Sequence, residues 1–327
     1  MVRSRRERVH FAIVPDQSPQ RGKIALLFPG QGSQMVGMGA ELSRVFPEAA
    51  RTFEEANDTL GYDLRRIIFE GPHATLMRTD ICQPAVLTNS VAAWRVATSH
   101  GVTGDLAMGH SLGEYGALVA SGALDFSTAL RLVVERGRAA AEIAERVPGS
   151  MAALLGASDE EVEALCQEAG DVWPANYNCP GQVVASGLQR GVERLAELGR
   201  ARGFKIRLLD VDGAFHSAVM APAADRLREV LAGVRVSAPS VPFMSATTAA
   251  LEAGADRVRG ILTQQLTAPV RFTQSVRTAL DMGVDRFVEF GPRSVLVGLV
   301  RRVRSDVEAL HFGSPGELPG ITALARR

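Results

Sequence analysis

Residues 105–113 read DLAMGHSLG, and this stretch predicts the fold around it. Residues 105–108 are typical of a short buried strand, and GHSLG at 109–113 fits the pattern G-x-S-x-G. The two glycines permit a tight, strained turn from a strand into a helix, which lifts a serine hydroxyl above the sheet. Apolar residues recur at helical spacing after Ser111. We therefore expect a strand, a turn and a helix, with Ser111 at the helix N-terminus.

Strands and helices alternate on both sides of this turn. Further short apolar strands are expected at 23–28 and 285–290, and helices at 40–59, 84–99 and 127–146. Such alternation favours a parallel, doubly wound sheet. We predict an α/β fold whose large domain, residues 23–146 and 214–327, is α/β-hydrolase-like with a parallel sheet.

The middle of the chain carries a different pattern. Strands are expected at 150–155, 172–178, 182–186 and 204–211, and helices at about 158–169 and 189–202. The order β-α-β-β-α-β is the ferredoxin-like pattern, so we expect an inserted ferredoxin-like small subdomain at 147–213. The arginine-rich residues 1–22 are expected to be a flexible extension, with a functional basic arm as the alternative.

The composition limits the kinds of partner. Thirty-six basic and thirty-six acidic residues cancel, so we expect no nucleic-acid and no membrane partner. No run of 18 apolar residues occurs, and the N-terminal arginines precede only a short apolar run, which argues against a membrane span or a signal peptide. Cys82, Cys166 and Cys179 lie far apart without metal-ligand spacing, which predicts free thiols in a reducing cytoplasm and no metal site.

A serine hydroxyl needs a base before it can act as a nucleophile. Of the six histidines, His216 follows a predicted strand, and strand ends are where an α/β site collects its catalytic groups. His216 is therefore the candidate base for Ser111, with a partly buried helix-capping histidine as the alternative. His110 is expected to line the pocket, because neighbours in a tight turn point in different directions. An inert serine in a structural glycine turn is the alternative to a nucleophile.

A glycine-rich loop, PGQGSQ at 29–34, follows the first predicted strand. It lacks the Lys-Ser/Thr ending of a phosphate-binding loop and the spacing of a dinucleotide fingerprint. It fits an oxyanion loop better, with the backbone N–H of Gln31 as one donor. The N–H of Leu112, directly after Ser111, would be the other.

Arg136 lies in the largely apolar helical stretch LRLVVERGRAAA. An arginine on a buried helix face needs an anionic partner, and its planar guanidinium would suit a substrate carboxylate. The alternative is an ion pair on the helix surface with Glu135 or Glu142.

Seven motifs in order resemble one family. They are FPGQGSQ (28–34), TDICQPA (79–85), GHSLGEY (109–115), ERGR (135–138), NYNCPGQVVASG (176–187), GAFHS (213–217) and EFGP (289–292). This set is similar to malonyl-CoA:acyl carrier protein transacylases and to the acyltransferase domains of polyketide synthases. The resemblance covers about residues 23–304.

The resemblance implies a reaction and the residues that perform it. The malonyl group would pass from malonyl-CoA to the phosphopantetheine thiol of holo acyl carrier protein by a ping-pong mechanism, through an ester on Ser111 with His216 as the base. The backbone carbonyl of Gln265 would orient His216, and Arg136 would bind the malonyl carboxylate. Phe215 would crowd the malonyl C2 position and disfavour methylmalonyl.

The same resemblance implies a cytoplasmic, monomeric enzyme of fatty acid biosynthesis that uses no cofactor. The alternatives are a discrete acyltransferase of a polyketide pathway, an editing acyl hydrolase of the same fold, and an inactive interaction module. The chain departs from the family pattern in its N-terminal extension and in AAA at 139–141, where the family often has a methionine.

Overall fold

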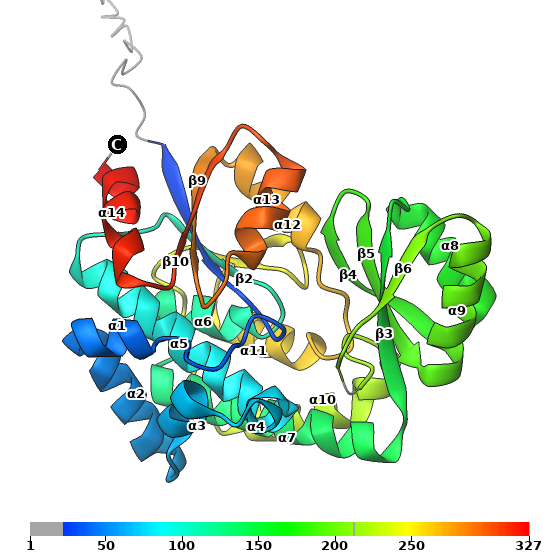
Figure 1. Cartoon of the computed structure of the whole chain (residues 1–327), viewed down its shortest axis with the longest axis horizontal. Helices are drawn as coiled ribbons and strands as arrows, with labels where there is room; N and C mark the ends of the chain where they lie inside the picture. The colour runs from blue at the N-terminus through cyan, green and yellow to red at the C-terminus, as the bar shows by residue number, and fades with distance from the viewer. Residues whose placement is uncertain (1–21, 212, 327) are drawn as a thin grey trace, which may run out of the picture.

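Two sheets, each with its own helices, make up the described part of the chain (Figure 1). The structure is a computed structural model and describes residues 22–211 and 213–326. The expected N-terminal extension, apart from Gly22, lies outside the described residues.

The larger sheet has six strands. Their bounds are β1 Lys23–Phe28, β2 Leu106–Gly109, β7 Phe243–Ser245, β8 Ala250–Glu252, β9 Val284–Phe290 and β10 Glu308–Phe312. The order is β10-β9-β1-β2-β7-β8, and all neighbours are parallel except β7 and β8. The predicted α/β fold with a parallel-rich sheet is confirmed. The sequence did not predict β7, β8 or β10. Strands β7 and β8 have only three residues each, which are too few to show a period.

Helices cover both faces of this sheet. The bounds are α1 Ala40–Val45, α2 Pro47–Leu60, α3 Leu64–Glu70, α4 His73–Met77, α5 Thr79–Ser99, α6 Gly113–Ala120, α7 Phe126–Arg146, α10 Ala221–Ala232, α11 Ala255–Gln264, α12 Phe272–Asp281, α13 Val295–Val303 and α14 Leu318–Arg326. On β1, Leu26 and Phe28 pack into the core that contains α2, α5 and α7, whereas Ala25 and Leu27 pack against α12 and α13. Burial on both faces explains why residues 24–28 are apolar throughout.

Two helices differ from the prediction at prolines. The single helix expected at 40–59 is divided into α1 and α2, because Pro47 starts a new helix. In contrast, α5 begins at Thr79 rather than at residue 84, and Pro84 lies inside it. Pro84 removes one backbone hydrogen bond from the helix. Because α5 is buried along most of its length, packing stabilises the turn before Pro84 in spite of this loss. That first turn places Thr79 and Gln83 beside the site described below.

The smaller sheet has four antiparallel strands. The bounds are β3 Gly149–Leu155, β4 Val172–Cys179, β5 Gln182–Leu188 and β6 Lys205–Leu208, with α8 Asp159–Ala169 and α9 Gln189–Ala201 between them. The strand order is β4-β5-β3-β6, and the chain order is the β-α-β-β-α-β that the sequence predicted. The capping box of Ser158 and Glu161 opens α8 as expected. Strand β6 ends at Leu208 rather than at residue 211.

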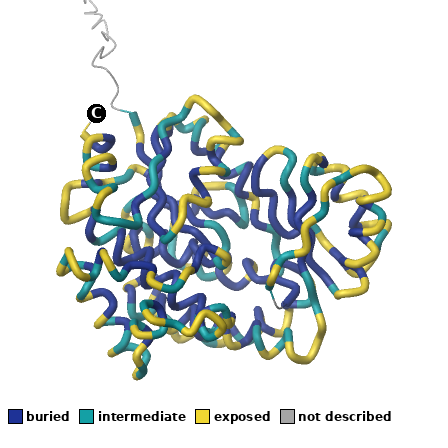
Figure 2. The backbone as a smooth tube through the Cα atoms, viewed as in Figure 1, coloured by how far each residue is buried: buried dark blue, intermediate teal, exposed yellow. Residues whose placement is uncertain are grey.

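Hydrogen bonds join the two parts near the edge of β4. The Tyr177 N–H donates to the Val270 carbonyl and the Val270 N–H to the Ala175 carbonyl, both at 2.8 Å. Thr273 Oγ1 donates to the Tyr177 carbonyl at 3.1 Å. Figure 2 shows buried backbone in both parts, with exposed segments at the periphery. Among residues 22–211 and 213–326, no helix is long and apolar enough to cross a membrane.

Candidate active site

Ser111 lies in the turn between β2 and α6, as the sequence predicted. Its φ is 53°, in the left-handed region that non-glycine residues rarely adopt. The flanking glycines make the turn possible, because a Cβ on Gly113 would overlap the Phe28 carbonyl, and one on Gly109 would overlap the backbone of Gly113. The turn therefore places the Ser111 hydroxyl at the carboxyl end of the parallel sheet.

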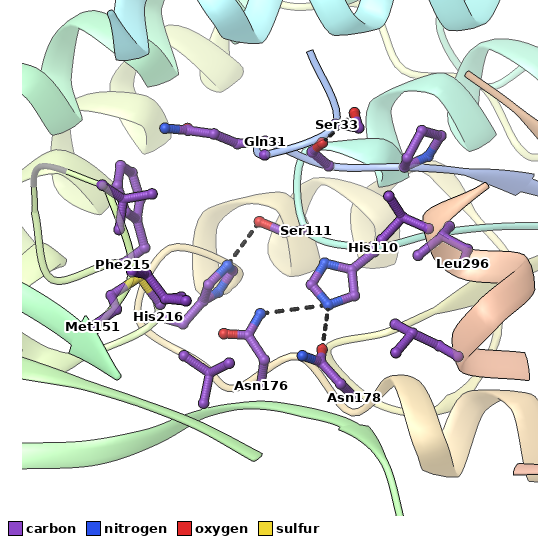
Figure 3. A pocket seen from close by; sticks show the side chains of 18 of the residues that line it. Gln31, Ser33, His110, Ser111, Met151, Asn176, Asn178, Phe215, His216 and Leu296 are labelled. Atoms are coloured by element: carbon purple, nitrogen blue, oxygen red, sulfur yellow. Dashed lines mark hydrogen bonds between the residues drawn. The ribbon is translucent and has the colours of Figure 1, made fainter. Parts of the chain in front are cut away.

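His216 lies within hydrogen-bond reach of this hydroxyl, with 2.7 Å between His216 Nε2 and Ser111 Oγ (Figure 3). On the other side of the ring, Nδ1 lies 2.9 Å from the Gln265 carbonyl and 3.0 Å from the Ala268 carbonyl. Carbonyl oxygens only accept, so Nδ1 carries the proton and Nε2 accepts from the hydroxyl. Ser217, rather than His216, caps the short helix that follows.

The surroundings of His216 favour its neutral form. Burial, followed by the Arg136 guanidinium and His110, lowers the pKa of His216 to about 3, against the opposing effect of the two carbonyls. The ring is therefore neutral at pH 7 and its Nε2 is free to take a proton. Ser111 and His216 can thus exchange a proton without any acidic side chain on the ring.

Arg136 points from α7 to the same hydroxyl and is only 1% exposed. One terminal nitrogen donates to Gln83 Oε1 at 2.8 Å, and the other donates to Ser111 Oγ at 3.0 Å. Its Nε–H is buried and has no hydrogen-bond partner among the described residues. Burial lowers the pKa of the guanidinium, because a cation away from water is disfavoured. An arginine cannot escape this cost by losing its proton, so the site calls for an anion.

The alternative of a surface ion pair for Arg136 is wrong. Glu135 accepts from Arg138 at 3.2 Å and from Arg226 at 3.1 Å, and Glu142 accepts from Arg226 at 2.8 Å. No carboxylate in the described chain forms an ion pair with Arg136.

Gln31 lies in the wall of the cavity that contains Ser111, and Leu112 is the residue at the N-cap of α6. The Gln31 side chain is tied to α5, since its Nε2 donates to Thr79 Oγ1 at 3.3 Å and its Oε1 accepts from Gln83 Nε2 at 3.4 Å. These bonds fix the glycine-rich loop next to the turn that carries Ser111.

A cavity of about 270 Å³ opens between the two sheets and contains the Ser111 hydroxyl. His110 and Phe215, the other two predicted pocket residues, both line it. Phe215 lies beside Met151 on the side of His216, where the wall is apolar (Figure 3). Six of the eight predicted site residues thus line one cavity. Leu112 and Gln265, for which only backbone roles were predicted, do not line it but lie next to Ser111 and His216.

The sequence missed four polar residues of this site. His110 Nε2 lies 2.8 Å from Asn178 Oδ1 and 3.5 Å from Asn176 Nδ2, and both asparagines line the cavity from β4 (Figure 3). Gln83 binds Arg136, and Glu114 lies behind the turn. All four stand inside quoted motifs, but an amide or a carboxylate in a motif carries no signal of which distant residue it contacts.

Two further histidines, His100 and His311, and the three cysteines have structural surroundings. His100 lies at the end of α5 with Nδ1 at 2.9 Å from the Val96 carbonyl, and His311 pairs with Glu317. The three predicted free thiols are free and buried. Cys82 lies near Arg136, but burial dominates and raises the pKa of the Cys82 thiol to about 12.

The family described as "Acyl transferase domain" matches residues 25–311. The malonyl CoA-acyl carrier protein transacylase of Bacillus subtilis (strain 168) is 42% identical over 298 residues, which are 90% of this chain and 94% of the relative. The chain belongs to the malonyl CoA-acyl carrier protein transacylase family.

Solved structures of this acyltransferase family superpose on nearly the whole chain. The malonyl CoA-acyl carrier protein transacylase of Coxiella burnetii has a TM-score of 0.91 at 35% identity, covering 95% of this chain and 100% of that one. A malonyl-transacylase in complex with its type II PKS acyl-carrier protein has a TM-score of 0.88 at 40% identity, covering 93% and 100%. The predicted family and its acyltransferase class are therefore confirmed.

Proposed function

We propose that this acyltransferase moves the malonyl group of malonyl-CoA to the phosphopantetheine thiol of holo acyl carrier protein. The observation that carries the proposal is Arg136. A buried guanidinium with an unsatisfied Nε–H, 3.0 Å from the Ser111 hydroxyl, is matched to an acyl group that ends in a carboxylate. The names of the relatives support the same substrate and the same acceptor.

In the proposed first half-reaction, Ser111 Oγ attacks the thioester carbonyl and gives its proton to His216 Nε2, 2.7 Å away. The backbone N–H groups of Gln31 and Leu112 hold the oxyanion that forms. When the C–S bond breaks, the proton passes from His216 to the sulfur of CoA. The malonyl group then remains as an ester on Ser111.

In the proposed second half-reaction, the carrier thiol gives its proton to His216 and its sulfur attacks the ester. The Ser111 oxygen leaves and takes the proton back, which restores the free enzyme. The carbonyl of Gln265 holds the Nδ1–H of His216 throughout, and Ala268 adds a second carbonyl. A carboxylate held on Arg136 would keep the acyl carbonyl in one place between the two steps.

The pocket walls support a preference for a small acyl group. Phe215 and Met151 close the side of the cavity next to His216. We propose that Phe215 disfavours methylmalonyl, by the roughly 1–3 kcal/mol that one methyl group is worth. His110 lines the opposite part of the cavity, and its hydrogen bond to Asn178 joins the serine turn to β4.

The same proposal includes the finer description of the fold and its setting. The large domain, residues 23–146 and 214–327, is taken as α/β-hydrolase-like, which the strand-turn-helix at Ser111 supports. The small subdomain, residues 147–213, is taken as ferredoxin-like, which the strand order β4-β5-β3-β6 supports. We further propose a cytoplasmic monomer that needs no cofactor and no metal and that binds neither nucleic acid nor a membrane.

Rapid mixing with radiolabelled malonyl-CoA tests the function. The wild-type chain should give a stable malonyl-protein that passes its label to holo acyl carrier protein, and Ser111→Ala should give none. Persistent labelling of a folded Ser111→Ala variant contradicts the mechanism. Steady release of free malonate would indicate an editing hydrolase, and the absence of any wild-type labelling would leave only an interaction module.

The pathway that we propose is fatty acid biosynthesis, and one observation favours a second candidate. The solved relative at 40% identity is bound to a type II PKS acyl-carrier protein. Comparing kcat/KM for a fatty acid carrier and a polyketide carrier decides between them, since the pathway enzyme should favour its own carrier.

A further inference from the structure

Glu114 is a fully buried carboxylate that stands three residues after Ser111. Its Oε1 accepts from Ser245 Oγ at 2.9 Å and from the Ala246 N–H at 2.6 Å, and its Oε2 accepts from Gln265 Nε2. Burial raises the pKa of Glu114, and the hydrogen bonds from these partners oppose that rise. Every one of the partners donates, which fits the ionised carboxylate because that form only accepts. The proposed reaction assigns no role to this group.

The side-chain amide of Gln265 joins Glu114 to the serine turn. Its Nε2 donates to Glu114 and also to the backbone carbonyl of Ser111, at 3.0 Å. Both acceptors are oxygens, so the amide nitrogen must face them. The backbone carbonyl of Gln265 accepts from His216 Nδ1 at 2.9 Å. One residue therefore contacts both Ser111 and His216.

Both of these residues need to be held. Ser111 has φ 53° and His216 has φ 59°, in the left-handed region that persists for such side chains only when the surroundings fix it. The 2.7 Å contact between them depends on both backbones staying there. Glu114 itself lies at the start of α6. Its carboxylate forms hydrogen bonds with the end of β7 and the end of α11, so it joins all three elements.

We propose, on the basis of the acyl transfer proposed above, that Glu114 is a positioning residue. Its carboxylate orients the side-chain amide of Gln265, and Gln265 then holds Ser111 and His216 at the distance that proton transfer needs. Glu114 contacts neither the substrate nor the serine hydroxyl. In a Ser-His-Asp triad the acid binds the imidazole directly. Glu114 differs because it acts through Gln265 and does not touch the His216 ring.

Glu114→Gln tests this role with little change in volume. The new amide presents an N–H where Gln265 needs an acceptor, so the Gln265 amide turns its oxygen toward residue 114 and loses its bond to the Ser111 carbonyl. We expect the single-turnover rate of malonyl-enzyme formation to fall about 10- to 100-fold, since small misplacements of reacting groups cost this much. The Kd for malonyl-CoA should stay within about twofold, since Glu114 does not touch the ligand.

Two further measurements separate positioning from a loss of folding. The proton signal of His216 Nδ1–H, held between two carbonyls, should shift in the NMR spectrum of Glu114→Gln. The double variant Glu114→Gln/Gln265→Ala should be no slower than the slower single variant, because both changes break the same link. Gln265→Ala keeps the backbone carbonyl, so its loss should be smaller than that of His216→Ala.

The matched control is Glu252→Gln. Glu252 is also a buried carboxylate of the large sheet, and it binds Thr248 and Arg257, both at 2.7 Å, away from the serine turn. Its acylation rate should equal that of the wild type even if its Tm falls. An equal loss of rate in this control would show a general effect of buried charge and would overturn the proposal.

The outcomes distinguish the two proposals. A wild-type chain that malonyl-CoA does not label refutes the proposed function itself. A labelled wild type together with a folded Glu114→Gln at the wild-type rate, or with additive losses in the double variant, refutes only the role of Glu114. If Glu114→Gln does not fold, Gln265→Ala decides: a loss of rate at constant Kd supports the proposal, and a wild-type rate overturns it.

Discussion

Three residues around one cavity are in states that are unfavourable on their own. Ser111 and His216 adopt left-handed backbone conformations, and Arg136 is a buried cation without a carboxylate partner in the described chain. Strained or desolvated groups of this kind persist only where the rest of the fold holds them, and they gather at functional sites. Their common location supports one site with one reaction.

Arg136→Ala should lower malonyl transfer by about 10- to 150-fold, since a hydrogen bond to a charged group is worth roughly 1.5–3 kcal/mol and each 1.4 kcal/mol is about tenfold. Relative activity on acetyl-CoA should rise, because the buried cation no longer demands an anion. The kcat/KM values for malonyl-CoA and acetyl-CoA measure this. Arg138→Ala, an exposed site on the same helix, is the control and should leave the ratio unchanged. An unaltered malonyl preference in Arg136→Ala would rule out the carboxylate role.

His216 makes the stability of the protein depend on pH. On folding, the pKa of His216 falls from its ordinary value of 6.5 to about 3, so below pH 6.5 the unfolded chain binds a proton that the folded chain does not. Stability is therefore lost as the pH falls from about 6.5 toward 3, by up to about 1.4 kcal/mol per pH unit for this group. His216→Gln should lose less stability than the wild type between pH 7 and pH 5 in urea unfolding. Equal pH slopes would contradict the burial of a neutral ring.

At the scale of elements, the long helix α7 carries Arg136 to the cavity from a well-capped start. Asp125 accepts from the Thr128 N–H at 2.8 Å, from Thr128 Oγ1 at 2.7 Å and from Ser127 Oγ at 2.9 Å. These bonds lower the pKa of Asp125, although burial opposes them. The cap at Asp125 and the site residue Arg136 lie at different points of the same helix. A change at the cap should therefore lower the stability of the protein without lowering its activity.

Asp125→Ala should lower the free energy of unfolding by about 1 kcal/mol, the usual cost of an N-cap, and leave malonyl-enzyme formation near the wild-type rate. Urea unfolding and rapid-quench labelling measure the two effects. Glu145→Ala, at an exposed position of the same helix, should change stability by no more than about 0.5 kcal/mol. A loss of activity equal to the loss of stability would show that the start of α7 sets the position of Arg136.

At the scale of the whole molecule, two sheets supply one cavity. The hydrogen bonds of Tyr177 and Val270 join β4 to the segment that follows Gln265 and Ala268, whose carbonyls hold His216. A further contact between the two parts is the bond between Asn178 of β4 and His110 of the serine turn. The smaller sheet therefore supports the chemistry of the larger one from across the cavity.

Asn178→Ala should break the bond to His110 and remove the hydrogen-bond acceptor of its half-buried imidazole N–H. We expect about 1–3 kcal/mol less stability and slower malonyl-enzyme formation. Thermal unfolding and rapid-quench rates on the same sample measure both. Gln189→Ala removes only the exposed bond of Gln189 to Glu193 in the same part of the chain and should change neither. Wild-type behaviour of Asn178→Ala would show that the bond across the cavity has no role.

The sequence by itself determined the local features. GHSLG predicted the strand, the turn and the helix around Ser111. The apolar runs and the capping box predicted the β-α-β-β-α-β order along the chain in the part that forms the smaller sheet. These follow from short-range rules, because glycine placement, periodicity and caps act within a few residues. The seven ordered motifs then identified the family.

Only the tertiary structure decided which side chains meet. His216 reaches Ser111 over 105 residues of sequence, Gln83 reaches Arg136 over 53, and Gln265 reaches Glu114 over 151. It also decided that Arg136 is buried rather than paired on the surface. A motif gives the type and order of its residues, whereas contacts at such separations arise only when the chain packs its elements around a common core, and burial then sets the charge that each group carries.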